Sequence, residues 1–153
     1  MVMSFQGQRG STEKTPEPQL MKVSDYMATK LITFHADQPI MDVIDSLLKN
    51  RISGGPVVND EGELVGVISE GDCLKEIVAS KYHNLPFTTE KVNDYMTLNP
   101  ITIDPEMNIF EAARNFLDSR VRRFPVVENK KLIGQISQKD IMRAVQNLKS
   151  YTW

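Results

Sequence analysis

The residues best suited to chemistry in this chain are a serine and an aspartate that occur twice at the same spacing. Ser69 precedes Asp72, and Ser137 precedes Asp140, each pair directly after a Gly-x-Ile segment. Where a strand passes into a helix, this spacing gathers a hydroxyl, a carboxylate and free backbone N–H groups in one small volume. Such a carboxylate could accept hydrogen bonds from both hydroxyls of a ribose. The same spacing also fits a helix capping box without a ligand, so the motif alone supports either interpretation.

A second group of candidate binding residues is a run of arginines before a Pro-Val-Val segment. Arg120, Arg122 and Arg123 stand there, whereas the matching segment nearer the N-terminus has Arg51 followed by Ser53-Gly54-Gly55. Guanidinium groups form paired hydrogen bonds with oxyanions, so this run suits a phosphate. The alternative is a solvated strand entrance that its charge keeps soluble. If both segments line pockets, the two pockets are unequal.

These candidates are duplicated because the chain consists of two related halves. The segment 22–27 returns as 91–96, and the Pro-Val-Val of 56–58 returns at 125–127, in the same order along the chain. Two copies indicate two units that pack together, since a solenoid needs three or more. Each copy has roughly 57 residues and would bury too little surface to be stable alone, so we expect the two to dock.

Hydrophobic spacing predicts the elements of each copy. Extended segments are expected at 32–34 and 101–103, a strand from 56, a second strand at 64–68, and final helices at 70–81 and 138–149. The copies therefore run strand, helix, strand, strand, helix, and the Asp-Tyr-Met that opens each copy is predicted to anchor a turn. The first helix of each copy has apolar residues at five positions of helical spacing: Ile40, Val43, Ile44, Leu47 and Leu48, then Ile109, Ala112, Ala113, Phe116 and Leu117.

Composition narrows the class of protein. Hydrophobic residues make up 41% and charged residues 25%, which is typical of a soluble globular protein, and the net charge of −2 offers no case for nucleic acid or a membrane surface. Cys73 is the only cysteine, and the only histidines, His35 and His83, lack metal-ligand spacing. No segment resembles a membrane span or a signal peptide, so we expect a cytoplasmic protein. We expect no enzyme and no catalytic cofactor.

Four segments are predicted along the chain. Residues 1–19 are polar and form a disordered tail, native or partly a cloning remnant. The first copy occupies 20–82, a linker that packs down through Leu85 and Phe87 occupies 83–90, and the second copy occupies 91–149.

In this order the motifs resemble a tandem pair of CBS domains, also called a Bateman module. The motifs that carry the resemblance are the Val-x-Asp-Tyr-Met opening, Ile-Thr, Pro-Val-Val and Gly-x-Ile-Ser-x-x-Asp, each present twice between about Met21 and Leu148. The resemblance implies a mixed α+β fold, in which two β-α-β-β-α repeats pack with pseudo-twofold symmetry, sheets inside and helices outside. It also implies two clefts between the repeats, which in family members often hold AMP, ADP, ATP, NAD or S-adenosylmethionine.

The resemblance also implies roles for residues in each cleft. In the first, Asp72 would hold the ribose, Thr102 and the Val121 backbone the adenine, and Arg122 and Arg123 the phosphates. The second lacks a positive side chain before its strand, so it would be empty, hold a less charged ligand, or accept a bulkier one against its glycines. The implied sets are Ser69, Asp72, Thr102, Val121, Arg122 and Arg123 for the first cleft, and Thr33, Ile52, Ser53, Gly54, Ser137, Lys139 and Asp140 for the second.

The resulting hypothesis is a sensor that binds an adenine nucleotide and passes its occupancy to an effector protein or to its own oligomer. The rival is an interaction or dimerisation module with vestigial clefts, in which the serines and aspartates only cap helices. A third class, an enzyme that uses the duplicated aspartates as acid and base, lacks a nucleophile, metal ligands and a Gly-rich phosphate loop. By family analogy we expect a homodimer formed through apolar faces of the final helices: Leu74, Ile77, Val78, Ile141, Val145 and Leu148.

Overall fold

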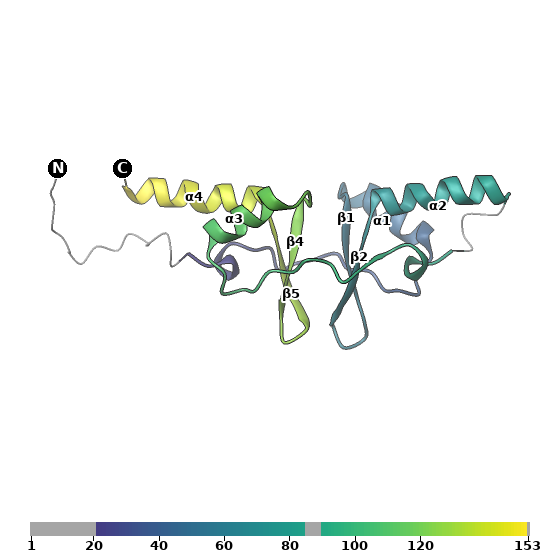
Figure 1. The fold of residues 1–153 in the computed structure, drawn as a ribbon, viewed down its shortest axis with the longest axis horizontal. Coiled ribbons are helices and arrows are strands. Elements are labelled where there is room, and N and C mark those ends of the chain that lie inside the picture. The colour runs from purple at the N-terminus through teal and green to yellow at the C-terminus, as the bar shows by residue number, and fades with distance from the viewer. Residues whose placement is uncertain (1–20, 85–89, 153) are drawn as a thin grey trace.

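The fold is mixed helix and strand, as the sequence predicts (Figure 1). The computed structural model describes residues 21–84 and 90–152, so the predicted tail at 1–19 and the predicted packing of Leu85 and Phe87 lie outside the described residues. The elements, in chain order, are η3 (Val23–Asp25), α1 (Ile40–Asn50), β1 (Gly54–Val58), β2 (Leu64–Ser69), α2 (Glu70–His83), η5 (Val92–Asp94), β3 (Thr97–Leu98), α3 (Ile109–Asp118), β4 (Arg123–Glu128), β5 (Lys131–Ser137) and α4 (Gln138–Thr152).

The first helix of each repeat, α1 or α3, forms where the apolar spacing predicts it. Ile40 and Leu47 are buried in α1, as Ile109 and Phe116 are in α3. The last of the five predicted apolar positions is wrong in both helices, because Leu48 is 75% exposed and Leu117 is 87% exposed. Eight residues along a helix lie about 80° beyond two full turns, which carries this position to the edge of the buried stripe.

The predicted first strand of each repeat is reduced to one bridge. Phe34 pairs in parallel with Val57, and Ile103 pairs in the same way with Val126. The backbone N–H of Phe34 donates to the carbonyl of Pro56, 2.9 Å between nitrogen and oxygen, and no ladder continues from there. The next bond toward the N-terminus would need an N–H on Pro56, which proline lacks. The equivalent Pro125 has the same effect in the second repeat.

The opening segments of the two repeats are exchanged. The Val23 N–H donates to the carbonyl of Met107 at 2.8 Å, and the Val92 N–H donates to the carbonyl of Gln38 at 2.9 Å. After η5, strand β3 of the second repeat joins the sheet of the first, giving the order β1-β2-β3, whereas β4 and β5 form a two-stranded sheet. Each opening turn, predicted as an anchor, is therefore anchored on the other repeat, and the boundaries at 20–82 and 91–149 stay predictions.

The glycine of each Gly-x-Ile-Ser motif makes this exchange possible. A Cβ atom at Gly66 would lie 2.8 Å from the carbonyl oxygen of Thr97, and one at Gly134 would lie 2.9 Å from that of Ala28. Real Cβ atoms do not approach backbone oxygens so closely, so any other residue would push the exchanged segment off the sheet.

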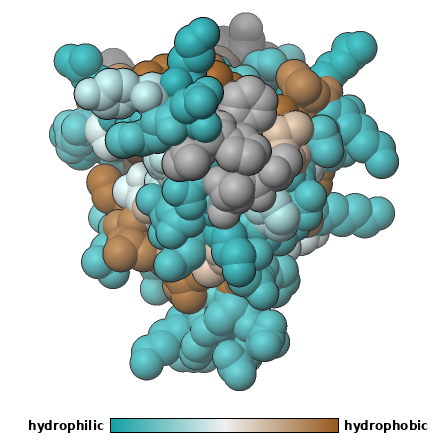
Figure 2. All heavy atoms as spheres, turned by 90° about the vertical axis from the view of Figure 1, so that its right-hand side faces the viewer, coloured by the Kyte–Doolittle hydropathy of each residue, from teal (hydrophilic) through white to brown (hydrophobic). Residues whose placement is uncertain are grey.

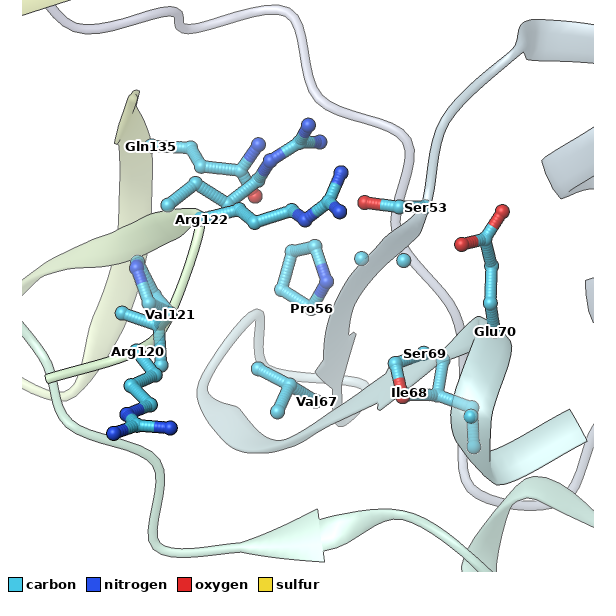
Figure 3. A pocket seen from close by; sticks show the side chains of 15 residues that line it. Ser53, Pro56, Val67, Ile68, Ser69, Glu70, Arg120, Val121, Arg122 and Gln135 are labelled. Carbon is cyan, nitrogen blue, oxygen red and sulfur yellow. The ribbon is translucent and has the colours of Figure 1, made fainter. Parts of the chain in front are cut away.

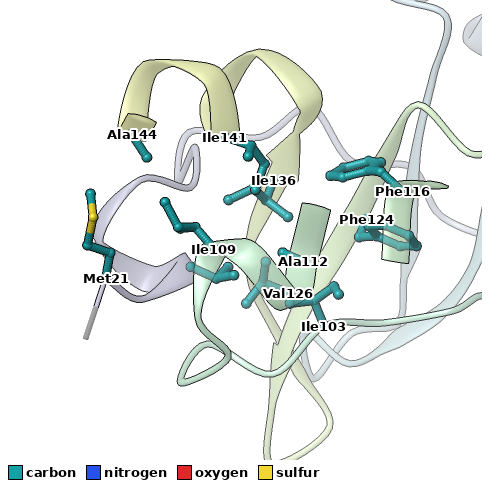
Figure 4. Close-up of a cluster of buried hydrophobic side chains, with 11 residues drawn as sticks. Met21, Ile103, Ile109, Ala112, Phe116, Phe124, Val126, Ile136, Ile141 and Ala144 are labelled. Atoms are coloured by element: carbon teal, nitrogen blue, oxygen red, sulfur yellow. The ribbon is translucent and has the colours of Figure 1, made fainter. Parts of the chain in front are cut away.

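The exchange also builds the two hydrophobic cores. Met21 and Val23 pack into the core of the second repeat, and Figure 4 shows Met21 at the edge of that cluster on the side of Ile109. The rings of Phe116 and Phe124 lie 4.5 Å apart, centre to centre, in the same cluster. Val92 completes the core of the first repeat in the same way. Neither core consists of residues from one repeat alone.

The two repeats meet through their hairpins, which stand next to each other in the middle of the molecule while α2 and α4 extend toward opposite ends (Figure 1). At the hairpin tips the Leu64 N–H donates to the carbonyl of Lys130 at 3.2 Å, and the Leu132 N–H donates to that of Gly62 at 3.1 Å. These backbone bonds fix the relative position of the repeats at one end of their contact. At the other end lies the cavity described below.

The outer surface carries the predicted apolar faces only in part. Figure 2, which views the α2 end, shows hydrophobic side chains as separate patches among hydrophilic ones. Leu74, Val78 and Val145 are exposed, as predicted, but Ile141 is buried and Leu148 packs against the second core, so the predicted face on α4 is smaller. In the described ranges no helix is long and apolar enough to cross a bilayer, and the cytoplasmic location stays a prediction.

Candidate functional site

A cavity of about 400 Å³ lies where the two repeats face each other at the starts of β1 and β4. Figure 3 shows Arg122 of the second repeat extending toward Ser53 of the first, with Ser69 and Glu70 on the opposite wall. The volume falls in the range that small-molecule sites occupy. The residues that line it are Ser53–Pro56, Val67–Gly71, Arg120–Arg123, Pro125 and Gln135.

This cavity joins residues that the sequence assigned to two separate clefts. Ser69, Val121 and the two arginines of the predicted first cleft line it, and so do Ser53 and Gly54 of the predicted second cleft. The reason is strand register, because Gly54 is the antiparallel partner of Ser69 across β1 and β2. Sequence reasoning also missed Glu70 and Gln135 as lining residues. Their closeness to the Gly-x-Ile-Ser motifs was the available signal.

The other predicted site residues lie elsewhere. Thr102 lines a separate cavity of about 260 Å³ with Leu64 and Lys130, and Lys139 lines a shallow groove on the surface of α4. Thr33 is exposed. Ile52 packs against the first hydrophobic core. The structure therefore does not bring these four residues into the cavity of Ser69.

Asp72 caps the helix that begins beside the cavity. Its Oδ2 atom accepts hydrogen bonds from the backbone N–H of Ser69 at 2.9 Å and from the Ser69 hydroxyl at 3.0 Å, and the side chain is buried. The Oδ1 atom has one charged neighbour among the described residues, the Lys75 ammonium at 3.9 Å. The capping interpretation is thus correct for α2, and one carboxylate oxygen is left without a close donor.

The matching carboxylate of the second repeat is fully engaged. Oδ2 of Asp140 accepts from the backbone N–H of Ser137 at 2.8 Å, and Oδ1 accepts from the Arg143 guanidinium at 2.7 Å. The two capping boxes are therefore unequal. A ribose diol at Asp140 would have to displace Arg143 at 2.7 Å, whereas at Asp72 it would face a lysine at 3.9 Å.

Three guanidinium groups give the cavity a positive wall. No carboxylate in the described part of the chain forms a salt bridge with Arg120, Arg122 or Arg123. The Nε atom of Arg123 is buried and has no hydrogen-bond acceptor among the described residues. Among the described residues, Glu70 is the single acid that lines the cavity. Such unpaired donors at a cavity suit an anionic ligand.

The two glycines opposite these arginines serve the strand packing. A Cβ atom at Gly54 would lie 2.6 Å from the carbonyl oxygen of Ile68, and one at Gly55 would lie 2.9 Å from the Phe34 ring. A side chain at either position would therefore collide with the first repeat itself. Both glycines still line the cavity with their backbone, so the option of a bulkier ligand packed against them stays a prediction.

A buried carboxylate that sequence reasoning missed lies one helical turn beyond Asp72. Glu76 is 1% exposed, and its Oε1 atom accepts a hydrogen bond from the Tyr95 hydroxyl at 2.9 Å. Its Oε2 atom is buried without a partner among the described residues. The hydrogen bond to Glu76, followed by burial, raises the pKa of Tyr95 to about 12. The spacing of Glu76 from the buried Cys73 was the signal, since both face the core.

Cys73 is a packed small side chain. It is buried in the first core, and burial is the main cause that raises the pKa of its thiol. Within the described ranges no group of histidine, cysteine, aspartate and glutamate side chains could hold a metal ion.

Similar proteins agree with this architecture. A protein of Methanocaldococcus jannaschii, MJ1426, is 32% identical over 159 residues, which cover 83% of this chain and 92% of that protein. The crystal structure of CBSX2 in complex with AMP, a protein of Arabidopsis thaliana, is 31% identical and superposes with a TM-score of 0.75 over 84% of this chain and 98% of that chain.

A third similar protein was solved with other adenosine-containing ligands. The CBS domain pair of protein MJ0100, solved with 5′-methylthioadenosine and S-adenosyl-L-methionine, is 26% identical with a TM-score of 0.69 over 83% of this chain and 97% of that chain. The family model of the CBS domain matches twice, at residues 23–79 and 92–147. The chain belongs to the CBS domain family, as a protein with two CBS domains in tandem.

Proposed function

We propose that this chain is a regulatory module that binds an adenosine-containing ligand in the cavity between its two CBS domains. The observation that carries the proposal is the cavity itself, in which the start of α2 on one wall faces unpaired arginines on the other. The relatives CBSX2 and MJ0100, solved with adenosine ligands, support it.

In this proposal each wall recognises a different part of the ligand. The start of α2, with the Ser69 hydroxyl and the Oδ1 atom of Asp72, would hold the ribose, and the guanidinium groups of Arg122 and Arg123 would hold the negatively charged end. Asp72 is buried and does not line the cavity, so its carboxylate would have to turn from Lys75 to reach the ribose. The backbone at Val121 also lines the cavity and would contact the base. Thr102 would need to move from its separate cavity to take part.

Regulation follows from the position of the cavity. A ligand that touches both repeats changes their relative angle to the extent that it binds one arrangement better than another. The hairpin tips, joined by backbone hydrogen bonds, would act as the fixed end of that movement. We propose that the change reaches an effector protein, or a second copy of the module docked on the exposed part of α2.

The second candidate is an interaction module whose cavity binds nothing. The two complete capping boxes favour it, because they account for Ser69, Asp72, Ser137 and Asp140 without a ligand. The two candidates differ in one measurable property, the response of thermal stability to ligand.

The test is a melting experiment with AMP, ADP, ATP, NAD and S-adenosylmethionine. A ligand at 100 times its dissociation constant should stabilise the fold by about 2.7 kcal/mol. Asp72→Ala and Asp140→Ala form a matched pair, since each removes a cap that contributes about 1 kcal/mol. We expect both variants to melt earlier, and only Asp72→Ala to lose the ligand response. No shift with any of the five ligands would favour the interaction module, and turnover of a nucleotide would indicate an enzyme.

A further inference from the structure

We propose that Glu76 and Glu90 make the attachment of the second repeat's opening segment to the first repeat sensitive to protons. This attachment, called the acidic joint below, consists of segment 90–98 and the parts of the first repeat that it contacts. A proton bound among its acids holds the segment more firmly, and loss of that proton loosens it. The inference concerns the joint itself and does not depend on which ligand the cavity binds.

Backbone hydrogen bonds fix segment 90–98 on the first repeat. The Ile40 N–H donates to the carbonyl of Glu90 at 3.0 Å, and the Asn93 N–H donates to the carbonyl of Ala36 at 2.8 Å. At its other end the segment forms β3, where Thr97 pairs with Val67, a residue that lines the cavity between the repeats. The acidic joint therefore holds a strand that lies directly beside the cavity wall.

A buried carboxylate without its full set of hydrogen bonds lies in this joint. Glu76 is 1% exposed, and its Oε1 atom accepts a hydrogen bond from the Tyr95 hydroxyl at 2.9 Å. Its Oε2 atom is buried and has no partner among the described residues. Buried polar atoms nearly always have a partner, and a carboxylate is costly to bury with a single donor. A proton carried by a neighbouring carboxyl would supply the missing donor.

Two further carboxylates, those of Glu90 and Asp94, belong to the segment that carries Tyr95. Desolvation, then the charge of Asp94 and a hydrogen bond with it, and finally the charge of Glu76 raise the pKa of Glu90. The hydrogen bond to Glu76 is the main cause that raises the pKa of Tyr95 to about 12, and the charges of Glu90 and Asp94 add to it. The three carboxylates and the tyrosine therefore act as one cluster, in which like charges repel one another.

The elements packed against Glu90 carry other charged or titratable groups, and none of those in the described ranges contributes to its raised pKa. They are Lys91 on its own segment, His35 and Asp37 in the turn before α1, Asp42 in the first turn of α1, and Asp72, Lys75, Lys81 and His83 on α2. Residues 85–89, Leu-Pro-Phe-Thr-Thr, contain no acidic or basic side chain. Asp94 and Glu76 are thus the charges that matter for Glu90 in the described structure.

The matching joint in the other direction has no such acids. Met21 stands at the position of Glu90, and Ala144 stands at that of Glu76. Both are buried in the second core, and Figure 4 shows both at the same edge of that cluster. Two positions that are apolar in one joint are therefore both acidic in the other. Since the fold holds its opening segment at 22–28 without these acids, they are not needed for attachment as such.

The sign of the effect follows from the raised pKa of Glu90. The folded protein binds this proton more tightly than the unfolded chain, in which the carboxyl has its ordinary pKa of 4.5. The resulting stabilisation is fully present below pH 4.5 and is lost as the pH rises through the folded-state value. Mild acidification should therefore strengthen the acidic joint and leave the apolar one unchanged.

The test is amide hydrogen exchange of the full chain, measured by NMR between about pH 4.5 and about pH 8 and corrected for intrinsic exchange. The Val92 N–H, bonded to the carbonyl of Gln38, reports on the acidic joint, and the Val23 N–H, bonded to that of Met107, reports on the apolar one. We expect the protection of Val92 to rise about twofold or more on acidification, the size of a typical exposed charge interaction. Equal changes at the two amides would overturn the inference.

A variant identifies the acid that is responsible. Glu90→Gln keeps the size of the side chain and removes its charge, so it should raise the melting temperature at about pH 8 and flatten the pH dependence of Val92 protection. Glu128→Gln is the matched control, because Glu128 is exposed and its side chain has no hydrogen bond or ion pair among the described residues. It changes the net charge equally and should alter neither property.

A second NMR measurement observes the proton directly, through the carboxyl carbon of Glu90. We expect this carbon to titrate above pH 4.5 in the folded protein. Titration at or below that value would overturn the inference, and so would a Glu90→Gln variant that melts earlier than the unaltered protein at about pH 8. Either result would leave the proposed ligand binding untouched, since neither measurement contains a ligand.

Discussion

The Tyr95 hydroxyl is the only hydrogen-bond donor that the described structure gives to the buried carboxylate of Glu76. The second repeat has no such pair, because Ala144 stands at the position of Glu76 and Tyr26 at that of Tyr95. The opening segment of the second repeat thus has a buried side-chain hydrogen bond to the first, whereas Tyr26 in the opposite direction only packs against the second core. This difference allows each tyrosine to serve as the control for the other.

Tyr95→Phe should destabilise the protein by about 1–3 kcal/mol, because it leaves a buried carboxylate without any donor. Tyr26→Phe should change the free energy of unfolding by less than about 0.5 kcal/mol, since its hydroxyl has no hydrogen bond among the described residues. Urea denaturation of both variants measures the difference. Equal losses would mean that the Glu76 contact contributes nothing specific.

The same contact predicts how stability depends on pH. The pKa of Tyr95 rises from 10.0 to about 12 on folding, so the folded state holds this proton more tightly than the unfolded state. Its contribution to stability is fully present below pH 10 and is lost as the pH rises toward 12. Tyr95→Phe should therefore reduce the fall in unfolding free energy across this window, and Tyr26→Phe should not. Identical pH profiles for the two variants would contradict the assignment.

At the scale of elements, periodicity predicted those parts of the fold that depend on local spacing. Helices α1 and α3 form where their apolar stripes require, apart from Leu48 and Leu117 at the stripe edge. The shortened strands at Phe34 and Ile103 depend on a proline in a neighbouring strand, which no local pattern shows. The buried face of α2 includes Glu76 and Ser80. Because these side chains are polar, the hydrophobic pattern of the sequence does not indicate which face of this helix is buried.

The candidate site was predicted less completely for a related reason. Ser69 and Arg122 were identified from motif and charge, but their cavity also uses Ser53, which the register of β1 and β2 brings beside them. Register and the exchange of opening segments are long-range properties. A single sequence indicates strand register and segment exchange only through a resemblance to known structures. Here that resemblance identified the family but assigned the residues of one cavity to two clefts.

At the scale of the whole molecule, the exchange of opening segments means that each hydrophobic core has different sequence boundaries from the repeat that it belongs to. The core of the first repeat runs from Phe34 to Val92, with Met96 packed against it. A fragment of residues 30–98 contains all of that core, whereas 20–82 lacks Val92 and β3. We expect 30–98 to show the more cooperative thermal unfolding by circular dichroism. The opposite ranking would contradict the exchanged arrangement.

The unequal halves also predict how many ligands the module takes. Both repeats line the same cavity, since Pro56 and its counterpart Pro125 are both among the lining residues. We therefore expect one ligand there instead of one ligand for each repeat. The alternative carboxylate, Asp140, already accepts a hydrogen bond from Arg143 at 2.7 Å. Calorimetric titration with AMP should therefore give one ligand per chain, and Arg143→Gln should leave that number unchanged. A stoichiometry of two in the unaltered protein would show that Arg143 yields its carboxylate to a ribose and that the halves are functionally equivalent.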